Sequence, residues 1–156
     1  MGESQSSLFQ PDFNGSIRVE ARAHRLSADA GALLLRELMD RSGVGALLEE
    51  HLIDARAPER VWHSLIELLR TWLLLIGQGW SDQADVELLG EDPVLRLAVS
   101  EQRGAGVLAA RERLCSQPTR SRLLQMLSAP ANREGLAQVL LDAAALRQQR
   151  RTGGSA

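Results

Sequence analysis

Aromatic residues are scarce in this sequence: they make up 3% of the 156 residues, and Tyr is absent. A core must therefore be built largely from Leu and Ala, which favour helix over strand. The chain is long enough for one domain with a real core. Its 44% hydrophobic and 24% charged residues are ordinary for a globular protein. The composition thus predicts a mainly α fold.

Features of disulfide, metal and membrane proteins are also missing. The single cysteine, Cys115, excludes a disulfide within the chain and fits a reducing compartment. His24, His51 and His63 lack the spacing of zinc ligands, so we expect no metal and no cofactor. The N-terminus has no apolar signal segment, and the most apolar run, 72–76, is far too short to cross a bilayer. We expect a cytoplasmic protein with no membrane contact.

Lysine is absent, so all 18 basic residues are Arg, and the formal net charge is −2. This balance argues against a chain that coats nucleic acid over its whole surface. The charge is unevenly distributed, however. Residues 1–101 hold 9 Arg against 17 acidic residues, whereas residues 102–156 hold 9 Arg against only Glu112, Glu134 and Asp142. The asymmetry indicates a basic face in the last third, with ordinary solvated helix surface as the alternative interpretation.

The apolar periodicity predicts a multi-helix orthogonal bundle with one short N-terminal strand. Residues 17–23 alternate apolar and charged side chains, as a half-buried strand does. This strand needs a pairing partner, which lies either in this chain or in a part missing from it. Helices are predicted from Ser27 to near Gly43, and over 45–52, 58–76, 81–89, 92–97, 107–114, 117–127 and 134–147. We expect a helical domain over 16–149, disordered tails over 1–15 and 150–156, and a linker near 100–106.

The longest predicted helix begins at Pro58, a residue suited to a first helical turn. An apolar stripe runs along it at steps of three and four residues, through Trp62, Leu65, Leu69, Trp72 and Ile76. Leu73, Leu74 and Leu75 widen the stripe until that end is apolar on every side. We therefore expect this end to lie at the centre of the core.

Residues 107–127 carry a possible helix-turn-helix, with a break at 114–116 between two helical stretches. Ser116 can cap the second helix, and Pro118 fits its first turn. A recognition helix presents its N-terminal residues to base edges, and guanidinium, amide and hydroxyl groups suit bases and phosphates. The candidate DNA-binding residues are Arg111, Arg113, Gln117, Thr119, Arg120, Ser121 and Arg122. The alternative is an ordinary surface helix with polar ends.

Four stretches, in order, resemble the N-terminal region of DDE transposases of bacterial insertion sequences, the group with a split RNase H-like catalytic domain. Residues 26–37 resemble the family's L-T-S-D-A-G-x-L-L-L-R-E, and residues 58–70 its R-V-x-H-S-L-x-E-L-L-R helix. Residues 79–98 resemble G-Y-E-D-x-x-D followed by D-D-P-x-L-R-L-A. Residues 116–123 resemble S-Q-P-T-L-S-R-L, with Arg120 in place of an apolar residue.

The resemblance implies DNA transposition, with this chain cut off before the first catalytic Asp. Strand transfer needs carboxylates that hold two metal ions about 4 Å apart. Asp29, Asp82, Asp85 and Asp92 are better interpreted as helix-start or solvated residues. We therefore expect no catalysis by this chain alone. Duplex DNA at the transposon's terminal repeats is the expected partner, together with full-length transposase or a second copy. A protein-interaction fragment without a DNA role and a non-functional decayed product are the alternatives.

Overall fold

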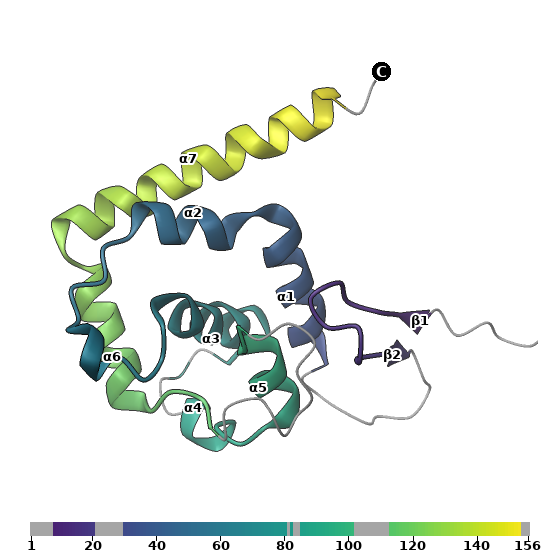
Figure 1. The fold of residues 1–156 in the computed structure, drawn as a ribbon, viewed down its shortest axis with the longest axis horizontal. Helices are drawn as coiled ribbons and strands as arrows, with labels where there is room; N and C mark the ends of the chain where they lie inside the picture. The colour runs from purple at the N-terminus through teal and green to yellow at the C-terminus, as the bar shows by residue number, and fades with distance from the viewer. Residues whose placement is uncertain (1–7, 21–29, 81, 83–84, 102–112, 154–156) are drawn as a thin grey trace, which may run out of the picture.

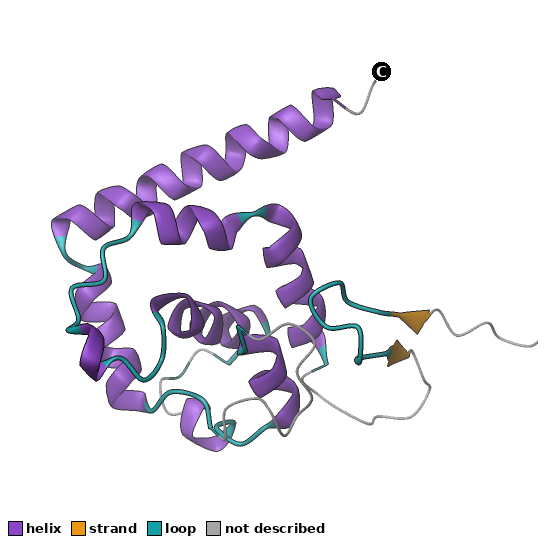
Figure 2. Ribbon diagram, viewed as in Figure 1, coloured by secondary structure: helices purple, strands orange, loops and turns teal. Residues whose placement is uncertain are grey.

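The computed structural model describes residues 8–20, 30–80, 82, 85–101 and 113–153. Helices dominate this part of the chain, as Figure 2 shows, so the prediction of a mainly α fold is confirmed. The elements in chain order are β1 (Leu8–Phe9), β2 (Val19–Glu20), α1 (Gly31–Ser42), α2 (Val44–His51), the 3₁₀ turn η1 (Pro58–Arg60), α3 (Leu65–Gly77), α4 (Asp85–Leu88), α5 (Pro93–Val99), α6 (Gln117–Leu127) and α7 (Pro130–Gly153).

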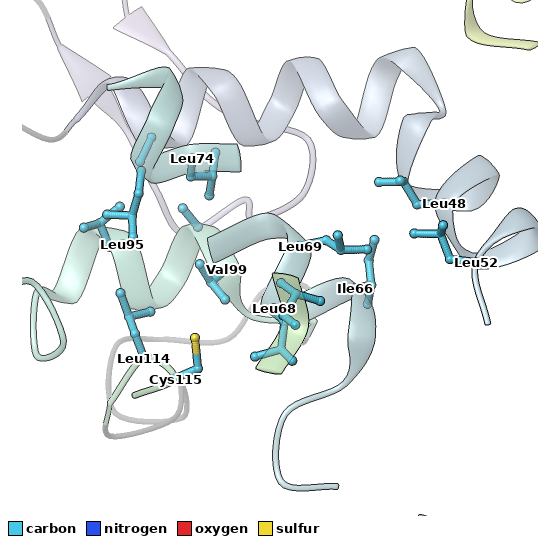
Figure 3. Packing of buried hydrophobic residues seen from close by; sticks show 14 of the residues in the cluster. Leu48, Leu52, Ile66, Leu68, Leu69, Leu74, Leu95, Val99, Leu114 and Cys115 are labelled. Carbon is cyan, nitrogen blue, oxygen red and sulfur yellow. The ribbon is translucent and has the colours of Figure 1, made fainter. Parts of the chain in front are cut away.

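Helix α3 occupies the centre of the fold and packs against α1, α2, α5 and α6 (Figure 1). Its buried leucines include Leu68, Leu74 and Leu75. Figure 3 shows side chains of α5, among them Leu95 and Val99, beside those of α3 in the same cluster. The core is therefore rich in Leu and has few aromatic side chains, as the composition predicts.

The predicted helix from Pro58 is wrong in its first part. Pro58 begins only the short turn η1, and α3 starts seven residues later, after Ser64. The Ser64 hydroxyl accepts a hydrogen bond from the backbone N–H of Glu67 at 3.1 Å. This side-chain cap satisfies an N–H that an uninterrupted helix would have paired with a carbonyl, and so marks a helix start.

The predicted apolar stripe is also only partly buried. Trp62 precedes α3 and is 79% exposed. At the other end of α3, Leu73 and Ile76 are exposed while Leu74 and Leu75 are buried. The C-terminal half of α3 therefore has one solvent-facing side among the described residues, and the expectation of burial all round was wrong.

Residues 8–15 form part of the fold rather than the tail we expected over 1–15. Strands β1 and β2 pair antiparallel, with Leu8 opposite Glu20 and Phe9 opposite Val19. The strand predicted over 17–23 is not confirmed over that range, because only Val19 and Glu20 have strand geometry among its described residues. Its residues 21–23 lie outside the described part. Phe13 is buried against α1, where its ring lies 4.8 Å from the Arg36 guanidinium carbon.

Two adjacent buried side chains on α1, Arg36 and Glu37, bind different neighbouring segments. Glu37 accepts hydrogen bonds from the backbone N–H of Asp12 at 2.8 Å and of Phe13 at 3.4 Å. Arg36 donates to the carbonyls of Ala98 at 2.5 Å and Ser100 at 2.8 Å, at the end of α5. These two adjacent side chains therefore connect α1 to the N-terminal segment on one side and to α5 on the other.

Helix α7 runs along α2 at the edge of the molecule (Figure 1). Asn132, at its start, is buried and bonds both backbone groups of Ile53 and the carbonyl of Met126. Farther along, His51 of α2 lies 2.8 Å from Asp142. The helix continues through Arg150 and Arg151, so the tail predicted over 150–156 was wrong for 150–153; residues 154–156 lie outside the described part.

Candidate nucleic-acid interface

The start of α6 has the backbone that the sequence predicted. Ser116 is extended and occupies the cap position, and Pro118 lies in the first turn, where its missing N–H costs no helical hydrogen bond. The Ser116 hydroxyl does not bond the helix backbone, however; it lies 3.0 Å from the Thr119 hydroxyl. Leu123 and Leu127 are buried and anchor the inner face, as expected.

One face of α6 carries exposed polar side chains. Gln117, Ser121 and Arg122 are exposed, and Thr119 is half-buried. The Ser121 hydroxyl donates to the carbonyl of Gln117 at 3.2 Å, one turn earlier. The face therefore presents an amide, a hydroxyl and a guanidinium within about one turn of the helix start, a set of groups that can bind phosphates and base edges.

Arg120 does not belong to this face. It is 1% exposed, and its Nη1 lies 3.4 Å from the carbonyl of Asp82. Position 120 is three residues before Leu123 and seven before Leu127, so it lies on the buried side of the helix. The prediction of Arg120 as a DNA contact is therefore corrected: in this fold it is a core residue. The sequence did carry a signal for this burial, because the family motif that residues 116–123 resemble has an apolar residue at this position.

Arg122 borders a shallow hollow between residues 53–56, α6 and the start of α7. Arg56 also lines it, but Asp54 binds the Arg56 guanidinium through two hydrogen bonds of 2.8 and 2.6 Å. The same hydrogen bonds hold the pKa of Asp54 below its usual value. Arg122 makes no such ion pair with any residue in the described ranges, so it remains an available cation at this rim.

The helix predicted over 107–114 and the linker near 100–106 lie largely outside the described residues, as does Arg111. Arg113 is described and exposed, and its Nε lies 3.6 Å from an oxygen of Glu91. The following backbone N–H, of Leu114, donates to the carbonyl of Gly90 at 2.8 Å. The chain that leads into α6 is thus held against the connection between α4 and α5.

Glu87 is the residue of this region that sequence reasoning missed. Its carboxylate accepts a hydrogen bond of 2.9 Å from the backbone N–H of Gln117, in the first turn of α6. The sequence showed only a short acidic helix over 81–89. Because 30 residues separate the two partners, no local pattern could have predicted their contact.

Cys115, beside the start of α6, is buried with its thiol near Thr71 (Figure 3 shows it next to Leu114). Burial raises the pKa of the Cys115 thiol to about 11, although nearby Arg120 opposes the shift. Because the thiolate is the reactive form, we expect iodoacetamide to modify the native protein slowly at pH 8 and the urea-unfolded protein rapidly. Mass spectrometry of quenched samples measures both rates; equal rates would contradict a buried thiol.

Two of the described carboxylates that could be suspected of binding metal serve structural contacts instead. Asp92 caps α5 through the N–H groups of Val94 and Leu95, at 2.9 and 2.8 Å. Asp40 binds Arg36 at 3.0 Å. Across the ranges that the structure describes, no group of three or more His, Cys, Asp or Glu side chains is placed to hold a metal ion. In the same ranges, no helix is long and apolar enough to span a bilayer.

The fold and this site define a mainly helical protein with a polar, arginine-bearing helix start on its surface. The family model described as Transposase DDE domain group 1 matches residues 9–152. The chain belongs to this family, which links it to DNA transposition and to interaction with DNA in general. Searches of curated proteins and of solved structures give no significant match.

Proposed function

We propose that this chain is the DNA-binding part of a DDE transposase, and that the exposed face at the start of α6 contacts transposon-end DNA. The observation that carries the proposal is the exposure of Gln117, Ser121 and Arg122 together on one face of a helix whose opposite face is anchored in the core. A helix with this arrangement can place its N-terminal side chains in a major groove. Family membership supplies the context for a nucleic-acid ligand.

We propose that Arg113 extends this surface and contacts the phosphate backbone of the DNA. Its contact with Glu91 is between two largely exposed side chains, with exposed fractions of 60% and 74%. Such pairs are weak in water, so a phosphate can replace the carboxylate. Arg111 and Thr119 remain in the proposed set as predictions. Arg120 leaves it because of its burial.

The chain binds DNA without cutting it in this proposal, and it does so in the cytoplasm. Support comes from the structural contacts of the acidic side chains Asp40, Asp54 and Asp92, each of which serves an ion pair or a helix cap. Metal-dependent strand cleavage by the purified chain would contradict this part of the proposal.

Self-association, or assembly with full-length transposase, is the second candidate function. Leu140 and Leu141 on α7 are 73% and 64% exposed, and they lie on the side of the helix that does not face α2. Adjacent exposed leucines favour a protein contact. A chain that forms dimers and is not retained on duplex DNA would favour this candidate over DNA binding.

The DNA proposal is tested by substituting the two arginines of α6 one at a time, because Arg122 is exposed and Arg120 is buried. We expect Arg122→Ala to weaken binding to a labelled random-sequence duplex several-fold, and to reduce the slope of log K against log salt concentration by about one. The matched variant Arg120→Leu removes an equal charge at a buried position and should leave both quantities unchanged. Fluorescence anisotropy over a salt series measures them, with circular dichroism to check folding. Equal binding by the wild type and Arg122→Ala would remove the proposal.

A further inference from the structure

The connection between α4 and α5 lies directly against the chain that enters α6. The hydrogen bond from the Leu114 N–H to the carbonyl of Gly90 joins the two segments, and both residues are buried. In Figure 1, α4 accordingly lies beside the starting end of α6. The backbone on either side of this buried bond is therefore held next to the proposed DNA-binding surface.

Two side chains that flank this bond along the chain are carboxylates. On one side of the bond Glu87 accepts from the backbone N–H of Gln117 at 2.9 Å, and on the other Glu91 lies 3.6 Å from Arg113. A first-turn N–H and a guanidinium are the groups to which a DNA phosphate would bind. Both partner residues, Gln117 and Arg113, are also DNA contacts that the sequence predicts.

We infer that Glu87 and Glu91 form an autoinhibitory contact, in which their carboxylates occupy the phosphate-binding groups of the α6 surface until duplex DNA displaces them. This inference rests on the proposed function and adds its regulation. The carboxylates compete with phosphates for the same N–H and guanidinium, and they repel an approaching duplex.

The contact is weak enough to be displaced. Glu87 and Glu91 are both exposed, and exposed ion pairs and hydrogen bonds gain little over water. The repulsion is screened over about 10 Å at 0.1 M salt. The two carboxylates should therefore lower duplex affinity most at low salt, and little at high salt.

The test is the double variant Glu87→Gln with Glu91→Gln. Gln keeps an oxygen that can accept the bond from the Gln117 N–H, so the fold is preserved while both charges are removed. The matched control is Glu49→Gln with Glu50→Gln, which changes the net charge equally at exposed positions of α2. At 50 mM salt we expect the first variant to bind a random-sequence duplex about three- to tenfold more tightly than the wild type. The control should change affinity less than about twofold.

Arg122→Ala, measured in the same series, separates the two ideas. If Arg122→Ala weakens binding and the Glu87/Glu91 variant behaves like its control, the autoinhibitory contact is overturned while the DNA proposal stands. If Arg122→Ala has no effect, or if neither the wild type nor the Glu87/Glu91 variant binds, both are overturned. Both ideas are supported if the Glu87/Glu91 variant binds more tightly than the wild type, its control does not, and adding Arg122→Ala to the Glu87/Glu91 variant abolishes the gain.

Discussion

Gly135→Ala is expected to lower the free energy of unfolding by about 3 kcal/mol, at the upper end of the cost of overpacking. A Cβ built at Gly135 would lie 2.2 Å from the backbone carbonyl oxygen of His51. Because this neighbour is backbone, it cannot move aside as a side chain can. The strain must separate α7 from α2, even though Ala is by itself about 1 kcal/mol better than Gly in a helix interior.

The control for this substitution is Gly45→Ala on α2. There the added Cβ meets only a methyl group of Ile66 at 3.7 Å, an ordinary contact. We expect no loss of stability from this change, and a small gain because the unfolded chain becomes less flexible. Urea unfolding followed by circular dichroism compares both variants with the wild type. A Gly135→Ala protein as stable as the wild type would show that α2 and α7 are not in contact at this point.

Arg36→Ala is the second substitution with a large expected effect, a loss of about 3–5 kcal/mol of stability, typical of breaking a buried ion pair. Arg36 is 2% exposed and donates to Asp40 as well as to the carbonyls of Ala98 and Ser100. Its removal takes this donor from the buried carbonyl of Ala98 and from the half-buried Asp40 and Ser100. It also removes the cation beneath the Phe13 ring.

The matched control for Arg36→Ala is Arg41→Ala, on the same helix. Arg41 binds Glu37 at 2.6 Å and Asp12 at 2.9 Å, and these carboxylates raise its pKa above the usual value. Its side chain is exposed, however, so solvent and salt screen the interactions. We expect a much smaller effect, which decreases further at high salt. Similar losses from the two substitutions in thermal unfolding experiments would contradict the buried role of Arg36.

Local signals in the sequence predicted much of the helical fold. The pair Asp92-Pro93 predicted the start of α5, and Pro118 predicted the first turn of α6. Both signals work through backbone chemistry within a few residues, which is why they are visible without a fold. The start of α3 was also encoded locally, by Ser64 and the N–H of Glu67, but the apolar stripe extending back to Trp62 obscured it.

The parts that could not be predicted depend on contacts between distant segments. Residues 8–15 look like a polar tail in the sequence. Contacts with α1 order them: Phe13 packs on Arg36, and Glu37 accepts hydrogen bonds from the Asp12 and Phe13 N–H groups. In the candidate site, Gln117 and Arg122 are exposed as a polar helix start suggests. Arg120 was misplaced because a charged side chain is usually on the surface, whereas here the fold buries it.

The crossing of α2 and α7 at Gly135 has a mechanical consequence. Eighteen residues of α7 follow that glycine, an arm of about 27 Å at 1.5 Å per residue. Beyond Val139 few side chains of the arm are buried, and its direction is fixed by polar contacts: His51 with Asp142, and Arg150 with the carbonyl of Arg41. A tilt of about 10° about the crossing would displace the end of such an arm by about 5 Å. A displacement at the His51–Asp142 contact, which lies near the crossing, is thus enlarged at the helix end, whereas the contact of Arg150 with the carbonyl of Arg41 holds that end directly.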